Sequence, residues 1–69
     1  MVKAQEYRDV TRFLKSEGWI LIRSGKGSHE IWGDPATGRR MSIPAHREVS
    51  AGIVRQIIAE FPSAPWTWR

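Results

Sequence analysis

A short segment, Gly27-Ser28-His29, carries the residue types needed for chemistry on a phosphate ester. It lies between two apolar runs and is preceded directly by Gly25-Lys26. Glycines let backbone N–H groups approach a phosphate closely, and a lysine adds a positive charge beside it. Histidine exchanges protons near neutral pH, so His29 could act as a general acid or base on that phosphate. A phosphate-binding loop beside a proton-transfer group suits the cutting of RNA without a metal ion, a reaction that needs one base and one acid.

The other histidine, His46, follows the dipeptide Pro44-Ala45. It could supply a second proton-transfer group or bind a phosphate, or it could begin a turn and have no chemical role. The alternative to a chemical role for His29 is that of a surface or strand-edge histidine that only forms a hydrogen bond with a neighbour. A zinc site can be assembled on paper from His29, Glu30, Asp34 and His46, but the spacing matches no compact ligand motif. We therefore expect no metal and no cofactor.

The excess of cationic over acidic side chains is concentrated in the middle of the chain. There are 11 Lys and Arg residues against 7 Asp and Glu, a formal net charge of +4. Residues 18–47 carry five of the cations and only two of the acids. Because arginine binds phosphate through a rigid two-pronged donor set, this excess favours nucleic acid as the partner over a merely solubilising surface. The candidate RNA contacts are Arg23, Lys26, Gly27, Ser28, Arg39, Arg40, His46 and Arg47.

The composition limits the kind of protein that this chain can be. Its 69 residues suffice for one domain with a thin core, and the absence of cysteine excludes disulfides and thiolate metal sites. The first residues contain no apolar run, so we expect no signal peptide, and no segment reaches the length needed to span a membrane. These features are typical of a cytoplasmic protein.

The elements that must position these groups begin with a helix over residues 3–17. Its apolar stripe is formed by Tyr7, Val10 and Leu14, which recur with helical spacing. Gly18 follows the last periodic residue, where a left-handed cap is favoured.

A second helix is predicted over residues 49–61, with Ser50 as its cap and a proline after its end. Between the helices, β-forming residues bounded by turn signals predict strands over 19–23, 28–33 and 39–43. The order is α-β-β-β-α, and the simplest packing is an α+β fold in which both helices cover one face of a three-stranded antiparallel sheet. Double-stranded-RNA-binding domains have this order.

Residues 1–62 are predicted to form the domain, and residues 63–69 to form a tail that contains Trp66 and Trp68. The simplest role of the tail is that one or both indole rings cover the core. A contact with a partner protein and a platform for base stacking are the alternatives.

A series of motifs runs through residues 10–61 in a specific order. They are Leu14, Gly18-Trp19, Arg23, Gly27-Ser28-His29, the turn from Pro35 to Gly38, Ile43-Pro44-Ala45-His46, Gly52 and Ile57-Ile58. In their order and spacing they resemble the HicA toxin family, the small mRNA-cleaving partners of HicB antitoxins. The Pro-Trp tail lies outside this pattern.

The resemblance implies a fold like that of double-stranded-RNA-binding domains and a metal-independent endoribonuclease that cleaves mRNA. It places the catalytic histidine at His29. It also implies a HicB-like antitoxin that covers the active site, and it leaves open whether the chain forms a homo-oligomer or a toxin–antitoxin hetero-oligomer. The alternative function is a non-catalytic RNA-binding module on the same fold.

Overall fold

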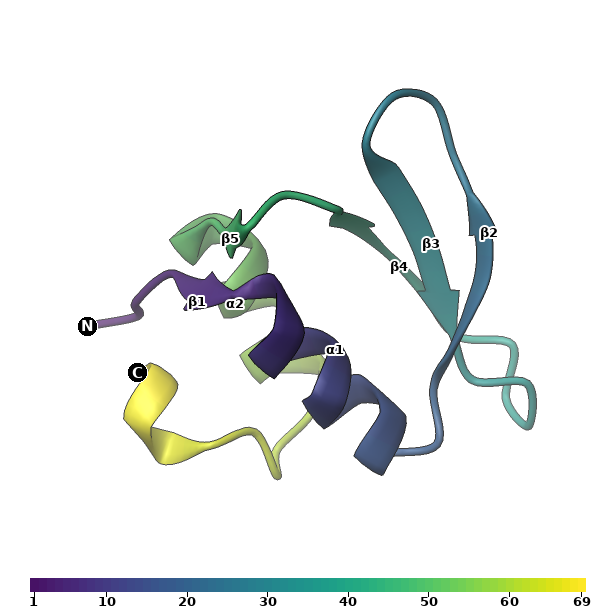
Figure 1. Ribbon diagram of the computed structural model, residues 1–69. Coiled ribbons are helices and arrows are strands. Elements are labelled where there is room, and N and C mark those ends of the chain that lie inside the picture. The colour runs from purple at the N-terminus through teal and green to yellow at the C-terminus, as the bar shows by residue number, and fades with distance from the viewer.

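The computed structural model describes residues 1–69 and contains a three-stranded antiparallel sheet with both helices on one face (Figure 1). The predicted fold class is confirmed, and a small two-stranded sheet is added to it. The elements are β1 (Gln5–Glu6), α1 (Tyr7–Ser16), β2 (Ile20–Ser24), β3 (His29–Gly33), β4 (Arg40–Pro44), β5 (Glu48–Val49), α2 (Ala51–Glu60) and the 3-10 turn η1 (Trp66–Trp68).

The main sheet has the order β2-β3-β4, so β3 is the central strand and the other two are edges. His29 at the start of β3 lies opposite Pro44 at the end of β4, and Gly33 at the other end lies opposite Arg40. A register shift interrupts the pairing of β2 with β3 between Leu21 and Arg23. The register therefore places the β2–β3 loop and the chain that leaves β4 at the same end of the sheet.

Helix α1 begins four residues later than predicted. Gln5 and Glu6 instead form β1, which pairs with Val49 and Glu48 of β5, and the backbone N–H of Tyr7 donates to the carbonyl of Arg47 at 2.8 Å. The sequence pattern could not exclude this because the apolar stripe itself starts only at Tyr7.

The C-terminus of α1 has the predicted cap. Gly18 has a φ of 86°, a left-handed conformation in which a side chain would be strained. Its N–H donates to the carbonyl of Lys15, and the N–H of Trp19 donates to that of Leu14, both at 3.0 Å. These two bonds satisfy carbonyl groups that the end of a helix leaves free, and they turn the chain toward β2.

Helix α2 is shorter than the predicted 49–61 because Val49 belongs to β5. Ser50 is the N-cap, as predicted, and its side chain accepts from the N–H of Ile53 at 3.5 Å. Phe61 follows the last helical turn and Pro62 comes next, which prevents the helix from continuing.

The core lies between the helices and the sheet and is closed by the C-terminal segment. An aromatic cluster of Phe13, Trp19, Phe61 and Trp68 forms part of it, with edge-on ring pairs whose centroids are 4.9–5.4 Å apart. Trp68 is buried, whereas Trp66 is 79% exposed, so one of the two tail rings covers the core. The buried apolar residues are Val10, Leu14, Trp19, Trp32, Ile43, Val49, Val54, Ile57, Phe61, Ala64 and Trp68.

Candidate active site at one end of the sheet

The loop between β2 and β3 is a tight turn that leads into His29. The N–H of Gly25 donates to the carbonyl of His29 at 2.6 Å, and the N–H of His29 donates to that of Lys26 at 3.2 Å. Gly27 has a φ of 63°, and a β-carbon placed on it would have no neighbour within 4 Å. The loop thus presents bare backbone and the exposed Lys26 to solvent, which is the geometry that lets a phosphate approach closely.

His29 lies on the face of the sheet that the helices do not cover. Its neighbours in β3 set this orientation, because alternate residues of a strand point to opposite faces. Trp32 is buried, and Glu30 accepts from the hydroxyl of Tyr7 on α1, so both point toward the helices. The exposed imidazole of His29 has one hydrogen-bonding neighbour, the Ser42 hydroxyl, 3.5 Å from Nδ1.

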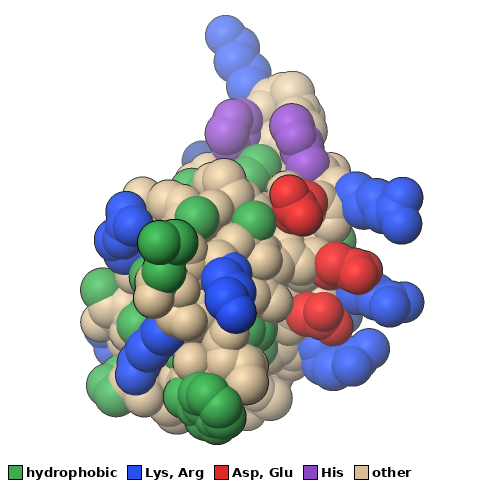
Figure 2. Space-filling view, turned by 90° about the vertical axis from the view of Figure 1, so that its left-hand side faces the viewer, with side chains coloured by type: hydrophobic (Ala, Val, Ile, Leu, Met, Phe, Trp, Pro, Cys, Tyr) green, Lys and Arg blue, Asp and Glu red, His purple; other side chains and the backbone are tan.

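The chain that leaves β4 brings His46 to the same end of the sheet. The N–H of Ala45 donates to the carbonyl of Ser28 at 2.6 Å, and Nε2 of His46 lies 2.5 Å from Oγ of Ser28. Figure 2 shows both histidine side chains together at one end of the molecule. We call this region, residues 25–29 and 44–47, the histidine end.

The predicted RNA contacts divide into two groups. Lys26, Gly27, Ser28, His46 and Arg47 belong to the histidine end.

The other three contacts lie outside these residue ranges, Arg23 close to them and the other two far from them. Arg23 is on the exposed edge strand β2, opposite Ile31. Arg39 and Arg40 are at the far end of the β3–β4 pair, and Arg39 forms an ion pair with Glu60 of α2. The structure therefore does not bring these two arginines together with the histidines.

Sequence reasoning missed a cation next to this site. Arg8 and Arg47 line one hollow of about 400 Å³ together with Glu6 and Tyr7. Oε2 of Glu6 lies 3.3 Å from Nε of Arg8, so this carboxylate is paired with one of the two guanidinium groups. The pairing of β1 with β5 brings the start of α1, with Arg8, next to the segment that contains Arg47. This pairing is not evident in the sequence, so no local signal links the two arginines.

Glu30 and Tyr7 form a partly buried contact behind the site. Glu30 also accepts from Nε1 of Trp32 at 3.1 Å. Burial, together with the hydrogen bond to Glu30 and its negative charge, raises the pKa of Tyr7 to about 12. The neutral phenol of Tyr7 thus remains a hydrogen-bond donor. The Glu30 carboxylate accepts its hydrogen bonds on the side of the sheet opposite to His29.

A family model with the description "HicA toxin of bacterial toxin-antitoxin" matches residues 7–61. This span contains the loop, both histidines and both helices, and it leaves out the tryptophan tail. The chain belongs to the HicA toxin family. No curated protein and no solved structure matches it significantly. As a HicA-family toxin, it is one half of a toxin–antitoxin system and has an antitoxin as its partner.

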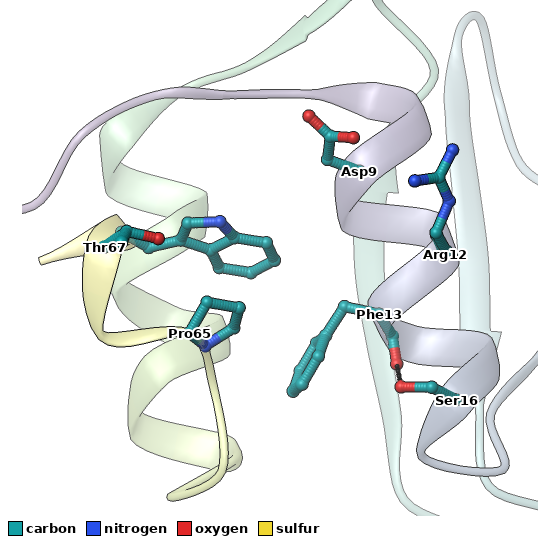
Figure 3. A pocket seen from close by; sticks show the side chains of 7 residues that line it. Asp9, Arg12, Phe13, Ser16, Pro65 and Thr67 are labelled. Atoms are coloured by element: carbon teal, nitrogen blue, oxygen red, sulfur yellow. Dashed lines mark hydrogen bonds between the residues drawn. The ribbon is translucent and has the colours of Figure 1, made fainter.

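The largest hollow of this HicA-family chain lies away from the histidines (Figure 3). It has a volume of about 430 Å³ and opens between α1 and the C-terminal turn. Phe13 and Trp68 of the aromatic cluster are part of its lining, and none of the predicted site residues is. The lining residues are Asp9, Arg12, Phe13, Ser16, Pro65, Thr67 and Trp68.

No group of three or more His, Asp or Glu side chains is placed to hold a metal ion. None of the helices has the length and apolar character that crossing a membrane requires.

Proposed function

We propose that this HicA-family toxin is a metal-independent endoribonuclease that cleaves mRNA, with His29 as a general acid or base. One observation carries the proposal: an exposed imidazole stands directly beside a glycine loop that carries a lysine, at an open end of the sheet. Lys26 and the bare backbone at Gly27 would hold the phosphate, and His29 would move a proton at the reacting oxygen.

The test is cleavage of RNA by the purified wild-type protein and by His29→Ala in the presence of a metal chelator. A general acid or base contributes about 10²–10⁴-fold to the rate, so the variant should lose that much. Because the His29 side chain is exposed, the circular dichroism spectrum and the melting temperature of the His29→Ala protein should match those of the wild type.

Ser42→Ala is the matched control, since Ser42 is also exposed on the same face and its hydroxyl lies 3.5 Å from His29. This variant should keep most of the activity. RNA binding without cleavage by the wild type would instead support the non-catalytic RNA-binding module.

A further inference from the structure

We propose that His46 is the second proton-transfer group of the cleavage reaction, the partner of His29. The inference rests on the ribonuclease function proposed above. In metal-free cleavage the 2′-oxygen bonds to phosphorus while the bond from phosphorus to the 5′-oxygen breaks, which leaves a 2′,3′-cyclic phosphate and a 5′-hydroxyl. One group takes the proton from the 2′-hydroxyl, and another gives a proton to the departing 5′-oxygen. The reaction therefore needs two groups, and His29 is only one of them.

The contacts of Ser28 tie the two histidines to one another. Ser28 precedes His29 in the chain, its carbonyl accepts from Ala45, and its hydroxyl lies 2.5 Å from Nε2 of His46. The residue that leads into one imidazole thus orients the other.

The other titratable groups nearby are unsuited to the task. Glu30 faces the helices and accepts hydrogen bonds from Tyr7 and Trp32. Tyr7 donates its hydroxyl to Glu30 and stays neutral far above physiological pH, since its pKa is raised to about 12. Lys26 offers a compact positive charge, which suits a phosphate oxygen. Imidazole is the side chain that exchanges protons near neutral pH, and only His46 adds a second one.

Several charged or titratable groups lie on the segments that pack against the His46 segment. Lys26 lies in the β2–β3 loop and His29 at the start of β3, and both elements pack against the segment that carries His46. Arg47 and Glu48 follow His46 in the chain. Tyr7 reaches this segment through its bond to Arg47. The pH dependence must therefore be compared between variants rather than read from the wild type alone.

The experiment compares the wild type with His46→Ala, His46→Gln and His29→Ala on an RNA oligonucleotide. The glutamine amide can keep a hydrogen bond to Ser28 but cannot exchange the proton. Both His46 variants should lower kcat by about 10²–10⁴-fold and remove one limb of the bell-shaped dependence of kcat/KM on pH. Arg47→Ala is the control for lost charge and should raise KM while both limbs remain.

A second substrate assigns the two roles. It carries sulfur in place of the 5′-oxygen at the bond that the wild type cleaves most, because a thiolate departs without being protonated. This substrate should restore cleavage to the variant that lacks the acid and not to the one that lacks the base. If the sulfur substrate restores cleavage to just one of the two histidine variants, the result supports His29 and His46 as an acid–base pair. If it restores cleavage to both variants or to neither, the pair is overturned.

Other outcomes also overturn the role of His46. If His46→Gln cleaves at the wild-type rate with both limbs intact, the ring only shapes the loop. If His46→Ala raises KM and leaves kcat unchanged, the ring binds phosphate. In either case, loss of cleavage in His29→Ala would still support the proposed ribonuclease function. A wild-type protein that cleaves no RNA would refute that function as well.

Ser28 is a positioning residue in this scheme, and it has its own readout. Ser28→Ala should displace the limb of the pH profile that His46→Gln removes, because the imidazole loses its partner. Ser28→Thr keeps the hydroxyl and should return that limb to its wild-type position. An unchanged profile in Ser28→Ala would show that the contact does not orient His46.

Discussion

The histidine end and the aromatic cluster are held together by different forces. The histidine end relies on a few backbone bonds and one side-chain contact, and both of its imidazoles are exposed. The aromatic cluster relies on burial and on edge-on ring contacts. A hydrogen bond contributes about 0.5–1.5 kcal/mol net, whereas removing a buried aromatic ring costs about 3–5 kcal/mol. Stability is thus concentrated away from the proposed chemistry.

This separation means that the two regions should respond to different substitutions. A change at the histidine end should alter cleavage and leave stability almost unchanged. A change in the aromatic cluster should do the opposite. Each of the following experiments tests that separation.

The largest expected effect is on stability. Trp68→Ala removes a buried ring that contacts Phe13 and should lower the free energy of unfolding by about 3–5 kcal/mol in a urea titration. Trp66→Ala is the matched control, since its ring is 79% exposed, and should change stability by no more than about 0.5 kcal/mol. Cleavage per folded molecule should be the same in both. Equal destabilisation by the two variants would contradict the role given to Trp68.

The next effect concerns RNA affinity. Each phosphate contact with a single strand contributes about −0.7 to the slope of log affinity against log salt, so Lys26→Ala combined with Arg47→Ala should flatten that slope by about 1.4. Arg39→Ala combined with Arg40→Ala is the control, because these residues lie at the far end of β3–β4 and Arg39 is paired with Glu60. If the control flattens the slope instead, the RNA crosses the open face of the sheet lengthwise.

The smallest effect lies at the border of the two regions, in the contact between Tyr7 and Glu30. The raised pKa of Tyr7, about 12, means that the folded protein holds the neutral phenol more strongly than the unfolded chain. The stabilisation is therefore complete below about pH 10 and is lost as the pH rises through the folded-state pKa. Wild type should exceed Tyr7→Phe in unfolding free energy near pH 8, and the difference should shrink toward pH 12. A difference that does not vary with pH would contradict this account.

Local patterns in the sequence were enough to predict both helices, the three strands and several caps. Periodicity reports which residues share a face, and Gly18 and Ser50 act within one helical turn, so these signals need no knowledge of distant contacts. The same local reasoning found Gly27-Ser28-His29 and His46 as candidates. It also found the ordered series of motifs that resembles the HicA family, whose model matches residues 7–61.

Tertiary structure decided which of these residues act together. The pairing of β1 with β5 shortens the first helix and brings Arg8 beside Arg47. The register of β3 against β4 carries Arg39 and Arg40 away from the histidines. The contact of Ser28 with His46 joins residues that are 18 positions apart. Such contacts depend on the mutual burial of whole elements, and no spacing along the chain encodes that burial.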